Sequence, residues 1–367
     1  MKNAVIWTAL IVAMLGIWLA LSIISNNADR VSYIPPADNQ EETDNLKKEI
    51  SKGIYEVCSD ISDCDIEYGI ARIKEAGLDS VIVTVIDEDD GNSLAYYDSD
   101  ILDRAEYIAN GYIEEIIRVA HQNDISVYLS INMPHNYLLN RHPDWITVWS
   151  DGRAGDYYHD DYFHRTVPPP RWIEEDEAKN LLKNLIAEVS ALGPDGIDIN
   201  DNFSFTDEYI ESTDTTLFAS FDDFTLEQFG GNPSMDNPDW LRWRADQVTA
   251  LIAYLDSVTE LPLRPHLLTH GNPYAYYGLD YEKLGDILDV MYLMIMPDQP
   301  RSKYLDLAGQ TEGGEYLSVS TYFIDDLENP YPLKTVMSWI QEMGADQINF
   351  YNFASIERHG LWNEISR

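Results

Sequence analysis

The sequence is poor in positive charge. Of its 367 residues, 24 are Lys or Arg and 64 are Asp or Glu, which gives a formal net charge of −40. Nucleic-acid backbones are bound by clustered Lys and Arg side chains, so we expect no nucleic-acid partner. The acidic residues are spread along the chain, as in halophilic proteins, where salt screens the self-repulsion of an acidic surface. An acidic partner-binding face is the alternative interpretation.

Cysteine is almost absent. The two cysteines, Cys58 and Cys64, lie close together in "VCSDISDC". Two thiolates with no histidine nearby do not complete a tetrahedral metal site, so we predict neither a metal nor another cofactor. A local disulfide is the favoured interpretation, and it implies an oxidising compartment.

Long apolar runs are also scarce, with one exception at residues 4–24, "AVIWTALIVAMLGIWLALSII". This run has no charge and is long enough to span a bilayer as a helix. No small-x-small cleavage site follows it, which favours an uncleaved single-pass anchor over a cleaved signal peptide that would leave the protein secreted. Lys2 precedes the run, so the positive-inside rule places the body outside the cytoplasm.

The chain divides into an anchor or signal segment (1–30), a polar linker (31–50) and a body (51–367). Strand-like runs alternate with helical patterns throughout the body. An open doubly wound sheet would normally carry a Gly-rich turn after its first strand, and none is present. Eight strands with intervening helices instead predict a (β/α)8 TIM barrel. The predicted strands are residues 53–58, 80–87, 125–133, 196–200, 264–269, 287–296, 315–323 and 347–353.

In such a barrel the active site lies at the C-terminal ends of the strands. The fourth predicted strand ends in "GIDIND", in which Asp198 and Asn200 share a parity and are expected to point into the barrel. Asp201 follows at the lip, where a helix cap or a loop aspartate is the alternative interpretation. The acidic stretch "DEDDG" (87–91), after the second strand, is more typical of a solvated loop.

The predicted loops on this side are rich in aromatic rings. Their flat faces, beside carboxylates, suit sugar rings, which present apolar C–H faces and polar edges. We therefore predict a carbohydrate substrate, bound by the following rim residues: His135, Trp145, Trp149, Asn200, Tyr292, Tyr322, Tyr351 and Asn352.

Several motifs resemble those of bacterial glycosyl-hydrolase-like barrels related to the hydrolase domain of the poly-N-acetylglucosamine export system. In chain order they are "HPDWITVWSDGR" (142–153), "RW" (171–172), "EAKNLLKNLIAEV" (177–189) and "DGIDIND" (195–201). The resemblance covers roughly residues 51–367 and implies a glycoside hydrolase. It places Asp201 on one aspartate of an acidic pair, and Asn200 stands at the other position.

The same stretch is similar, more weakly, to the strand motif of chitinase-type family 18 barrels. Asp195, Gly196 and Asp198 match that motif, but Asn202 stands at the position of the proton donor. Glycoside cleavage needs an acid for the leaving oxygen and a carboxylate on the other face of the sugar. We predict Asp201 as the acid and Asp198 as a residue that orients Asp201 or an N-acetyl group. Candidates for the second carboxylate are Asp298, Asp325 and Asp87, in that order.

Two other functions stay open. A non-catalytic carbohydrate-binding or cell-envelope barrel would explain the missing member of the acidic pair, since fold does not fix function. A metal-dependent polysaccharide deacetylase is suggested by "SFDD" (220–223) and by His266 and His270 in "HLLTH". However, "FDDFTLEQFG" (221–230) reads as a helix, and the two histidines straddle a strand end. The sequence does not indicate the oligomeric state.

Overall fold

The structure is a computed structural model that describes residues 50–89, 91–154, 166–200, 207–210, 215–269, 271–295, 299–311, 316–322 and 331–366. The apolar run at 4–24 lies outside these residues. Within the described ranges, none of the helices combines the length and the apolar character needed to cross a membrane.

Eight parallel strands close into a barrel, as the sequence predicts. The order is β1-β12-β11-β10-β9-β6-β5-β2, and β2 pairs with β1 to close the ring. The first predicted strand is shorter than expected, because β1 ends before Glu56, where the backbone turns to a positive φ. The strands are β1 (Ser51–Tyr55), β2 (Ser80–Asp89), β5 (Ser126–Asn132), β6 (Gly196–Asn200), β9 (Leu263–Leu268), β10 (Val290–Ile295), β11 (Tyr316–Tyr322) and β12 (Gln347–Tyr351).

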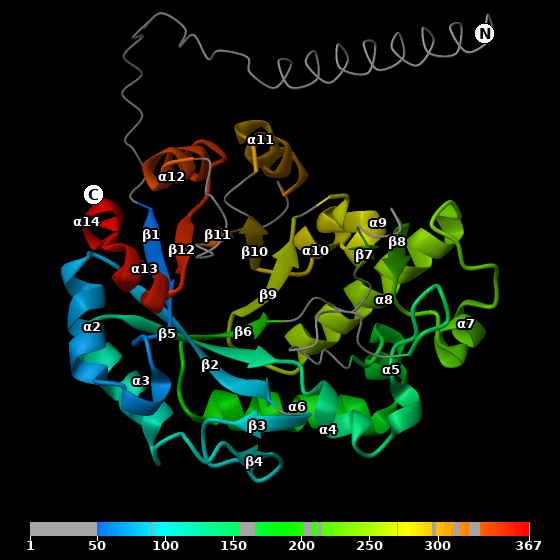
Figure 1. The fold of residues 1–367 in the computed structure, drawn as a ribbon, viewed down its shortest axis with the longest axis horizontal. Coiled ribbons are helices and arrows are strands. Elements are labelled where there is room, and N and C mark those ends of the chain that lie inside the picture. Colours follow the sequence, from blue (N-terminus) through cyan, green and yellow to red (C-terminus); the bar gives the residue numbers. More distant parts are fainter. Residues whose placement is uncertain are drawn as a thin grey trace, which may run out of the picture. The chain divides into compact units, whose positions relative to one another are not determined.

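The longer helices lie outside the strands (Figure 1). They are α2 (Ile66–Glu75), α3 (Tyr112–Gln122), α6 (Asp176–Ala191), α8 (Pro238–Ser257), α11 (Arg301–Gln310) and α12 (Leu333–Glu342). Side chains cap several of them; Asp65 accepts from the Tyr68 N–H at the start of α2, and Asn237 precedes Pro238 at the start of α8. Such caps satisfy amides that have no partner within the helix.

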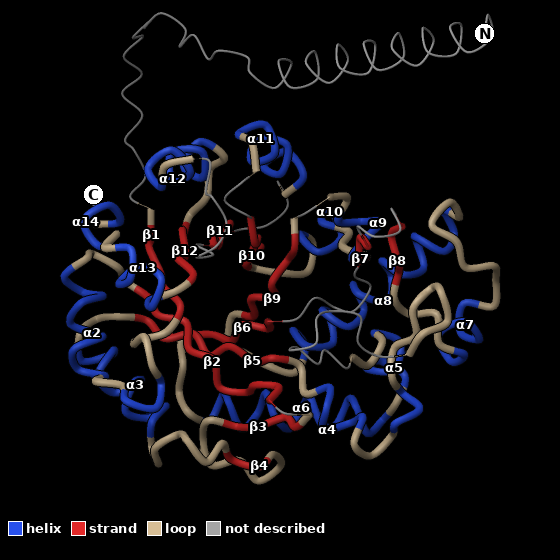
Figure 2. Tube along the Cα trace, in the orientation of Figure 1, coloured by secondary structure: helices blue, strands red, loops and turns tan. Residues whose placement is uncertain are grey.

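Shorter elements fill the connections, as the alternation of helix, strand and loop in Figure 2 shows. The short strands are β3 (Asn92–Ala95), β4 (Asp103–Arg104), β7 (Asp207–Ile210) and β8 (Thr215–Phe218). The short helices are α4 (His135–Leu139), α5 (Pro169–Glu174), α7 (Asp223–Phe229), α9 (Pro273–Tyr277), α10 (Tyr281–Gly285), α13 (Phe353–His359) and α14 (Trp362–Ile365), with 3-10 turns at Ile61–Asp63 and Pro143–Trp145.

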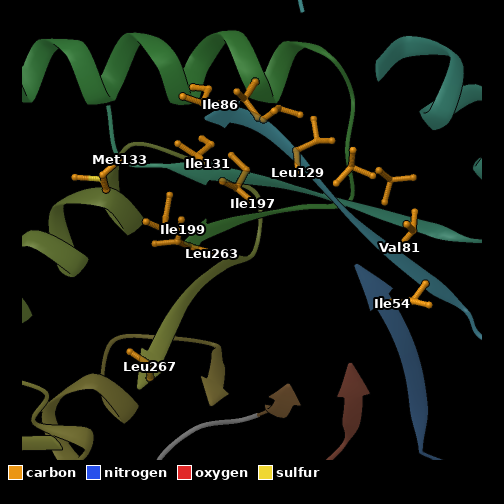
Figure 3. Packing of buried hydrophobic residues seen from close by; sticks show 14 of the residues in the cluster. Ile54, Val81, Ile86, Leu129, Ile131, Met133, Ile197, Ile199, Leu263 and Leu267 are labelled. Atoms are coloured by element: carbon orange, nitrogen blue, oxygen red, sulfur yellow. The ribbon is translucent and has the colours of Figure 1, made fainter. Parts of the chain in front are cut away.

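The main apolar core lies between the outer faces of the strands and the helices. Figure 3 shows Ile86, Leu129, Ile131 and Ile197 on the side of the strands that faces a helix. A much smaller aromatic cluster, built around Tyr55, fills part of the barrel interior. Many of the other inward side chains are polar, which sets this interior apart from the branched apolar filling usual in such barrels.

Gly196, in the "DGIDIN" stretch, makes room for part of this interior. A Cβ atom added at Gly196 would lie 2.7 Å from the ring of Tyr128 on β5. No side chain fits at this distance, so glycine lets the strand pass the ring. The Tyr128 ring in turn lies against the guanidinium of Arg264, 3.9 Å from the ring centroid.

The predicted disulfide is present between Cys58 and Cys64. It closes the short loop that follows β1, on the side of the barrel where the strands end. The Tyr112 hydroxyl of α3 lies 3.8 Å from both sulfur atoms. The loop after β1 is therefore held both covalently and by packing against α3.

Candidate active site

Asp198 and Asn200 point into the barrel, as their spacing in β6 predicts. Asp198 lies deep in the interior and is fully buried. Its Oδ1 is 3.0 Å from Nε of the equally buried Arg264 on the neighbouring strand β9. Burial opposes the charge on Arg264, but the charge of Asp198 and the surrounding tyrosines raise the pKa of Arg264 above its ordinary value. The two residues therefore form a buried ion pair beneath the rim.

His266 links this pair to the tyrosines of the interior. Its Nε2 lies 2.8 Å from the Tyr55 hydroxyl and 3.4 Å from Asp198 Oδ2, and its Nδ1 lies 2.9 Å from Asn200 Oδ1. Burial lowers the pKa of His266 below its ordinary value, so the neutral imidazole is favoured. With Nδ1–H donating to Asn200, the neutral ring accepts at Nε2 from Tyr55, whose oxygen is 2.6 Å from the Tyr292 hydroxyl.

From Asn200 the hydrogen bonds continue upward to a carboxylate at the rim. Asn200 Nδ2 donates to Asn132 Oδ1 over 2.8 Å, and Asn132 Nδ2 donates to Asp87 Oδ1 over 2.8 Å. Asp87 also accepts from the Glu88 N–H and, through Oδ2, from the Tyr96 hydroxyl at 3.0 Å. Three donors thus fix the orientation of a half-buried carboxylate at the mouth of the barrel.

A β-bulge turns Asp87 inward. Thr84 pairs with Ser130 of β5, but Ile86 pairs with Ile131, so β2 carries one extra residue between them. Without the bulge, Ile86 would share the inward parity of Thr84 and Asp87 would face the helices. With it, Ile86 joins the outer apolar core and Asp87 pairs across to Asn132. Bulges often re-aim side chains beside active sites in this way.

A second carboxyl, Glu56, lies at the mouth directly after β1. Its φ of 66° is in the left-handed region, which is costly for a residue with a side chain. Both the backbone N–H and Oγ1 of Thr84 donate to Glu56 Oε1, at 3.2 and 3.0 Å. Burial, opposed by these hydrogen bonds and assisted by the nearby charge of Asp87, raises the pKa of Glu56 to about 7.

The sequence offered no signal for the position of Glu56. The residue falls inside the predicted first strand "GIYEVC", where it reads as an ordinary strand position. Only the backbone turn after Tyr55 brings its side chain across to β2. Asp87, by contrast, was the third candidate for the second carboxylate, and it is the one of the three that lies among the described residues.

The other predicted site residues occupy varied positions. His135 is nearly buried; its Nδ1 accepts from the Val167 N–H, and its ring lies edge-on to Trp172. Trp145 is also nearly buried and stacks on His142 with ring centroids 4.1 Å apart. These two side chains hold the segment after β5 in place against its own neighbours.

In the barrel interior, Tyr292 is fully buried beside Tyr55, while Tyr351 is half-buried with its ring centroid 5.0 Å from that of Tyr55. Asn352 caps α13 by accepting from the Ser355 N–H. Trp149 is half-buried in the turn that follows the Pro143–Trp145 helix. The side chain of Tyr322, and the whole of Asp201, Asp298 and Asp325, lie outside the described residues.

Of the residues that suggested a metal-dependent deacetylase, Asp222 and His266 are described, and His270 lies outside the described residues. Asp222 caps α7 by accepting from the Thr225 N–H, so "SFDD" forms a helix start, as its sequence suggests. Both ring nitrogens of His266 are hydrogen-bonded within the barrel. Within the part of the chain that the structure describes, no group of three or more His, Cys, Asp or Glu side chains is placed to hold a metal.

Comparison with known proteins agrees with this architecture. Residues 65–201, which contain β2, β5 and β6, match the family model of hypothetical glycosyl hydrolase 6. Over these residues the chain resembles a glycosyl-hydrolase-like family. The resemblance drawn from the motifs is therefore confirmed, and the matched region includes Asp87, Asn132, Asp198 and Asn200. No curated protein matches the sequence.

Solved structures share the fold. The PgaB (BpsB) glycoside hydrolase domain from Bordetella bronchiseptica superposes with a TM-score of 0.61 and 15% identity, over 87% of this chain and 98% of that one. The catalytic domain of β-amylase from Paenibacillus polymyxa gives a TM-score of 0.59 and 11% identity, over 86% and 97% of the two chains. The α-L-fucosidase isoenzyme 2 from Paenibacillus thiaminolyticus gives 0.58 and 12%, over 87% and 48%.

Proposed function

We propose that the protein is a glycoside hydrolase that acts on a surface or extracellular polysaccharide. The observation that carries the proposal is Asp87, a carboxylate that a bulge turns into the mouth of a glycosyl-hydrolase-like barrel and that three donors hold in place. A carboxylate fixed in this way can stabilise the positive charge that develops at the anomeric carbon. The polar interior beneath it supplies a rigid support of buried hydrogen bonds.

Within this proposal Asp201 is the sequence-based candidate for the proton donor, and Asp298 is a further candidate carboxylate. Asp198 would act indirectly. Because it is buried and paired with Arg264, its contribution is to hold the Arg264 guanidinium beside the rings of Tyr128 and Tyr292. Substrate contacts are proposed for the aromatic residues that remain partly exposed at the mouth, such as Tyr351.

The test is hydrolysis of a panel of surface glycans in high salt, measured as the release of new reducing ends. Asp87→Asn keeps the shape of the side chain and is expected to lower kcat/KM by about 100-fold or more, because the developing charge is no longer stabilised. The matched control is Asp124→Asn, in an exposed turn that joins α3 to β5. Equal rates for the wild type and Asp87→Asn would show that Asp87 is not a catalytic residue.

A non-catalytic carbohydrate-binding barrel is the second candidate. It is favoured by Asn200, which stands where the related hydrolases carry an acid and which serves in the structure as a hydrogen-bond link. This function predicts that some glycans bind to the wild-type protein and that none is cleaved. Binding by calorimetry, together with an absence of new reducing ends, would select it over hydrolysis.

We also propose that residues 4–24 anchor the protein in the cell membrane with the barrel outside the cytoplasm, or direct its secretion if the segment is cleaved. The disulfide between Cys58 and Cys64 supports an oxidising compartment. Fractionation of cells that express the full chain or a variant lacking residues 1–30 tests this. Recovery of both proteins in the same soluble cytoplasmic fraction would contradict it.

A further inference from the structure

Glu56 has three structural features that an ordinary strand residue lacks. It takes a left-handed backbone conformation, it directly follows the last residue of β1 at the mouth of the barrel, and its carboxyl reaches sideways to the next strand. Costly backbone conformations of this kind persist where the surrounding structure enforces them, and they cluster at active sites. Here the enforcing contacts are those of Thr84 and the disulfide loop that starts at Cys58.

The contact with Thr84 explains how the carboxyl is placed. The Glu56 N–H donates to the Ile82 carbonyl, which is the last rung of the ladder between β1 and β2. Beyond this bond β1 has ended, so the Thr84 N–H of β2 has no main-chain carbonyl of β1 as its partner. Glu56 Oε1 accepts from this N–H instead. Thr84 Oγ1 donates to the same oxygen from the barrel interior. The carboxyl is therefore held between the two strands at the inner edge of the mouth.

The electrostatic surroundings suit a carboxyl that carries a proton. Asp87, on the next strand, is the charged group that acts on Glu56, and it disfavours a second negative charge there. Burial, together with the nearby charge of Glu56, raises the pKa of Tyr112 on α3 above its ordinary value. Two carboxyls with different environments are the usual basis of an acid and a carboxylate partner.

We propose that Glu56 is a catalytic carboxyl of this site and supplies the proton in place of Asp201. This inference rests on the proposed glycoside hydrolysis. Glu56 gives its proton to the glycosidic oxygen as the bond from that oxygen to the anomeric carbon breaks, with the electron pair of the bond remaining on the oxygen. Asp87 stabilises the charge at the anomeric carbon. Water then supplies its oxygen to that carbon and returns one proton to Glu56.

The experiment compares Glu56→Gln and Asp201→Asn on two substrates, a natural glycan and an aryl glycoside with a good leaving group. A general acid contributes about 100- to 10,000-fold to the rate. Glu56→Gln is expected to lose that factor on the glycan and much less on the aryl glycoside, whose leaving group needs no proton. The wild type is expected to lose activity above pH about 7, where Glu56 loses its proton, and this loss should vanish from the pH–rate profile of Glu56→Gln.

Glu115→Gln is the control. Glu115 lies on the exposed face of α3, where it pairs with Arg118. This variant is expected to keep the wild-type pH–rate profile. A purely structural role for Glu56 would reduce the rates on both substrates equally and leave the profile unchanged.

The outcomes separate the two proposals. If the wild type cleaves glycans, and Glu56→Gln keeps both the wild-type activity and the loss of activity above pH about 7, the assignment of Glu56 is overturned. The proposed hydrolase function is then retained. If instead Asp201→Asn shows the dependence on the leaving group, the proton donor is Asp201. If the wild type cleaves no substrate, the proposed function itself is refuted, and the assignment of Glu56 with it.

Discussion

The buried ion pair between Asp198 and Arg264 allows a quantitative test of how the barrel interior is stabilised. Asp198 Oδ1 and Arg264 Nε are 3.0 Å apart, and both side chains are almost completely inaccessible to solvent. Coulomb's law with an effective dielectric constant of about 20 gives an attraction of about 5 kcal/mol at this separation. The guanidinium also lies against the Tyr128 and Tyr292 rings, at 3.9 and 4.5 Å from their centroids.

Asp198→Asn is nearly isosteric but leaves Arg264 charged and without its counter-ion. Removing one partner of a buried ion pair costs about 3–5 kcal/mol, because the other charge remains desolvated. We expect the same loss for Arg264→Met. The double variant buries neither charge, so it should be no less stable than either single variant, which corresponds to a coupling energy of about 3–5 kcal/mol or more.

The assay is urea unfolding at one fixed salt concentration, monitored by tryptophan fluorescence. Arg118→Met is the control, since Arg118 and Glu115 form an exposed pair on α3 whose loss is expected to leave the unfolding midpoint unchanged. A loss below about 1 kcal/mol for Asp198→Asn, or additive losses in the double variant, would refute the argument that the interior is held by charge pairing.

Two further results are expected. Replacing both cysteines by serine should lower the free energy of unfolding by about 2 kcal/mol, because the disulfide closes a loop of sequence separation 6. A reductant should destabilise the wild type to the same extent and leave the double variant unaffected. Equal stability of the two proteins under oxidising conditions would contradict this prediction. Burial raises the pKa of Glu88 from 4.5 to about 7. Between these two pH values the folded protein therefore binds more protons at Glu88 than the unfolded chain does. As a result, Glu88 makes the free energy of unfolding fall as the pH rises through this range. Glu88→Gln should therefore raise the free energy of unfolding by about 3 kcal/mol at pH 8 and change it little at pH 4, as measured by urea unfolding; equal changes at both pH values would refute the assignment.

Sequence patterns were sufficient for the barrel because its strands are short runs with apolar outward residues, which are covered by helices, and because helical patterns separate them. Residues such as Ile197 and Ile199 alternate with Asp198 and Asn200, and this alternation correctly placed two polar side chains inside the barrel. The disulfide was also predictable, since two cysteines six positions apart have few other partners. These are local properties that are fixed by chemistry and spacing along one segment.

The tertiary structure alone decided which carboxyls lie at the mouth of the barrel. The bulge after Thr84 reverses the parity of β2 and moves Asp87 into the mouth, and a period-two pattern contains no sign of such an extra residue. The left-handed turn at Glu56 ends β1 early and carries its carboxyl to Thr84, although the sequence reads as uninterrupted strand. Both effects depend on the pairing of neighbouring strands in the closed barrel. For this protein, the sequence therefore determined the strands and pointed to the C-terminal end of the barrel, whereas the packing of strand against strand determined which acids lie there.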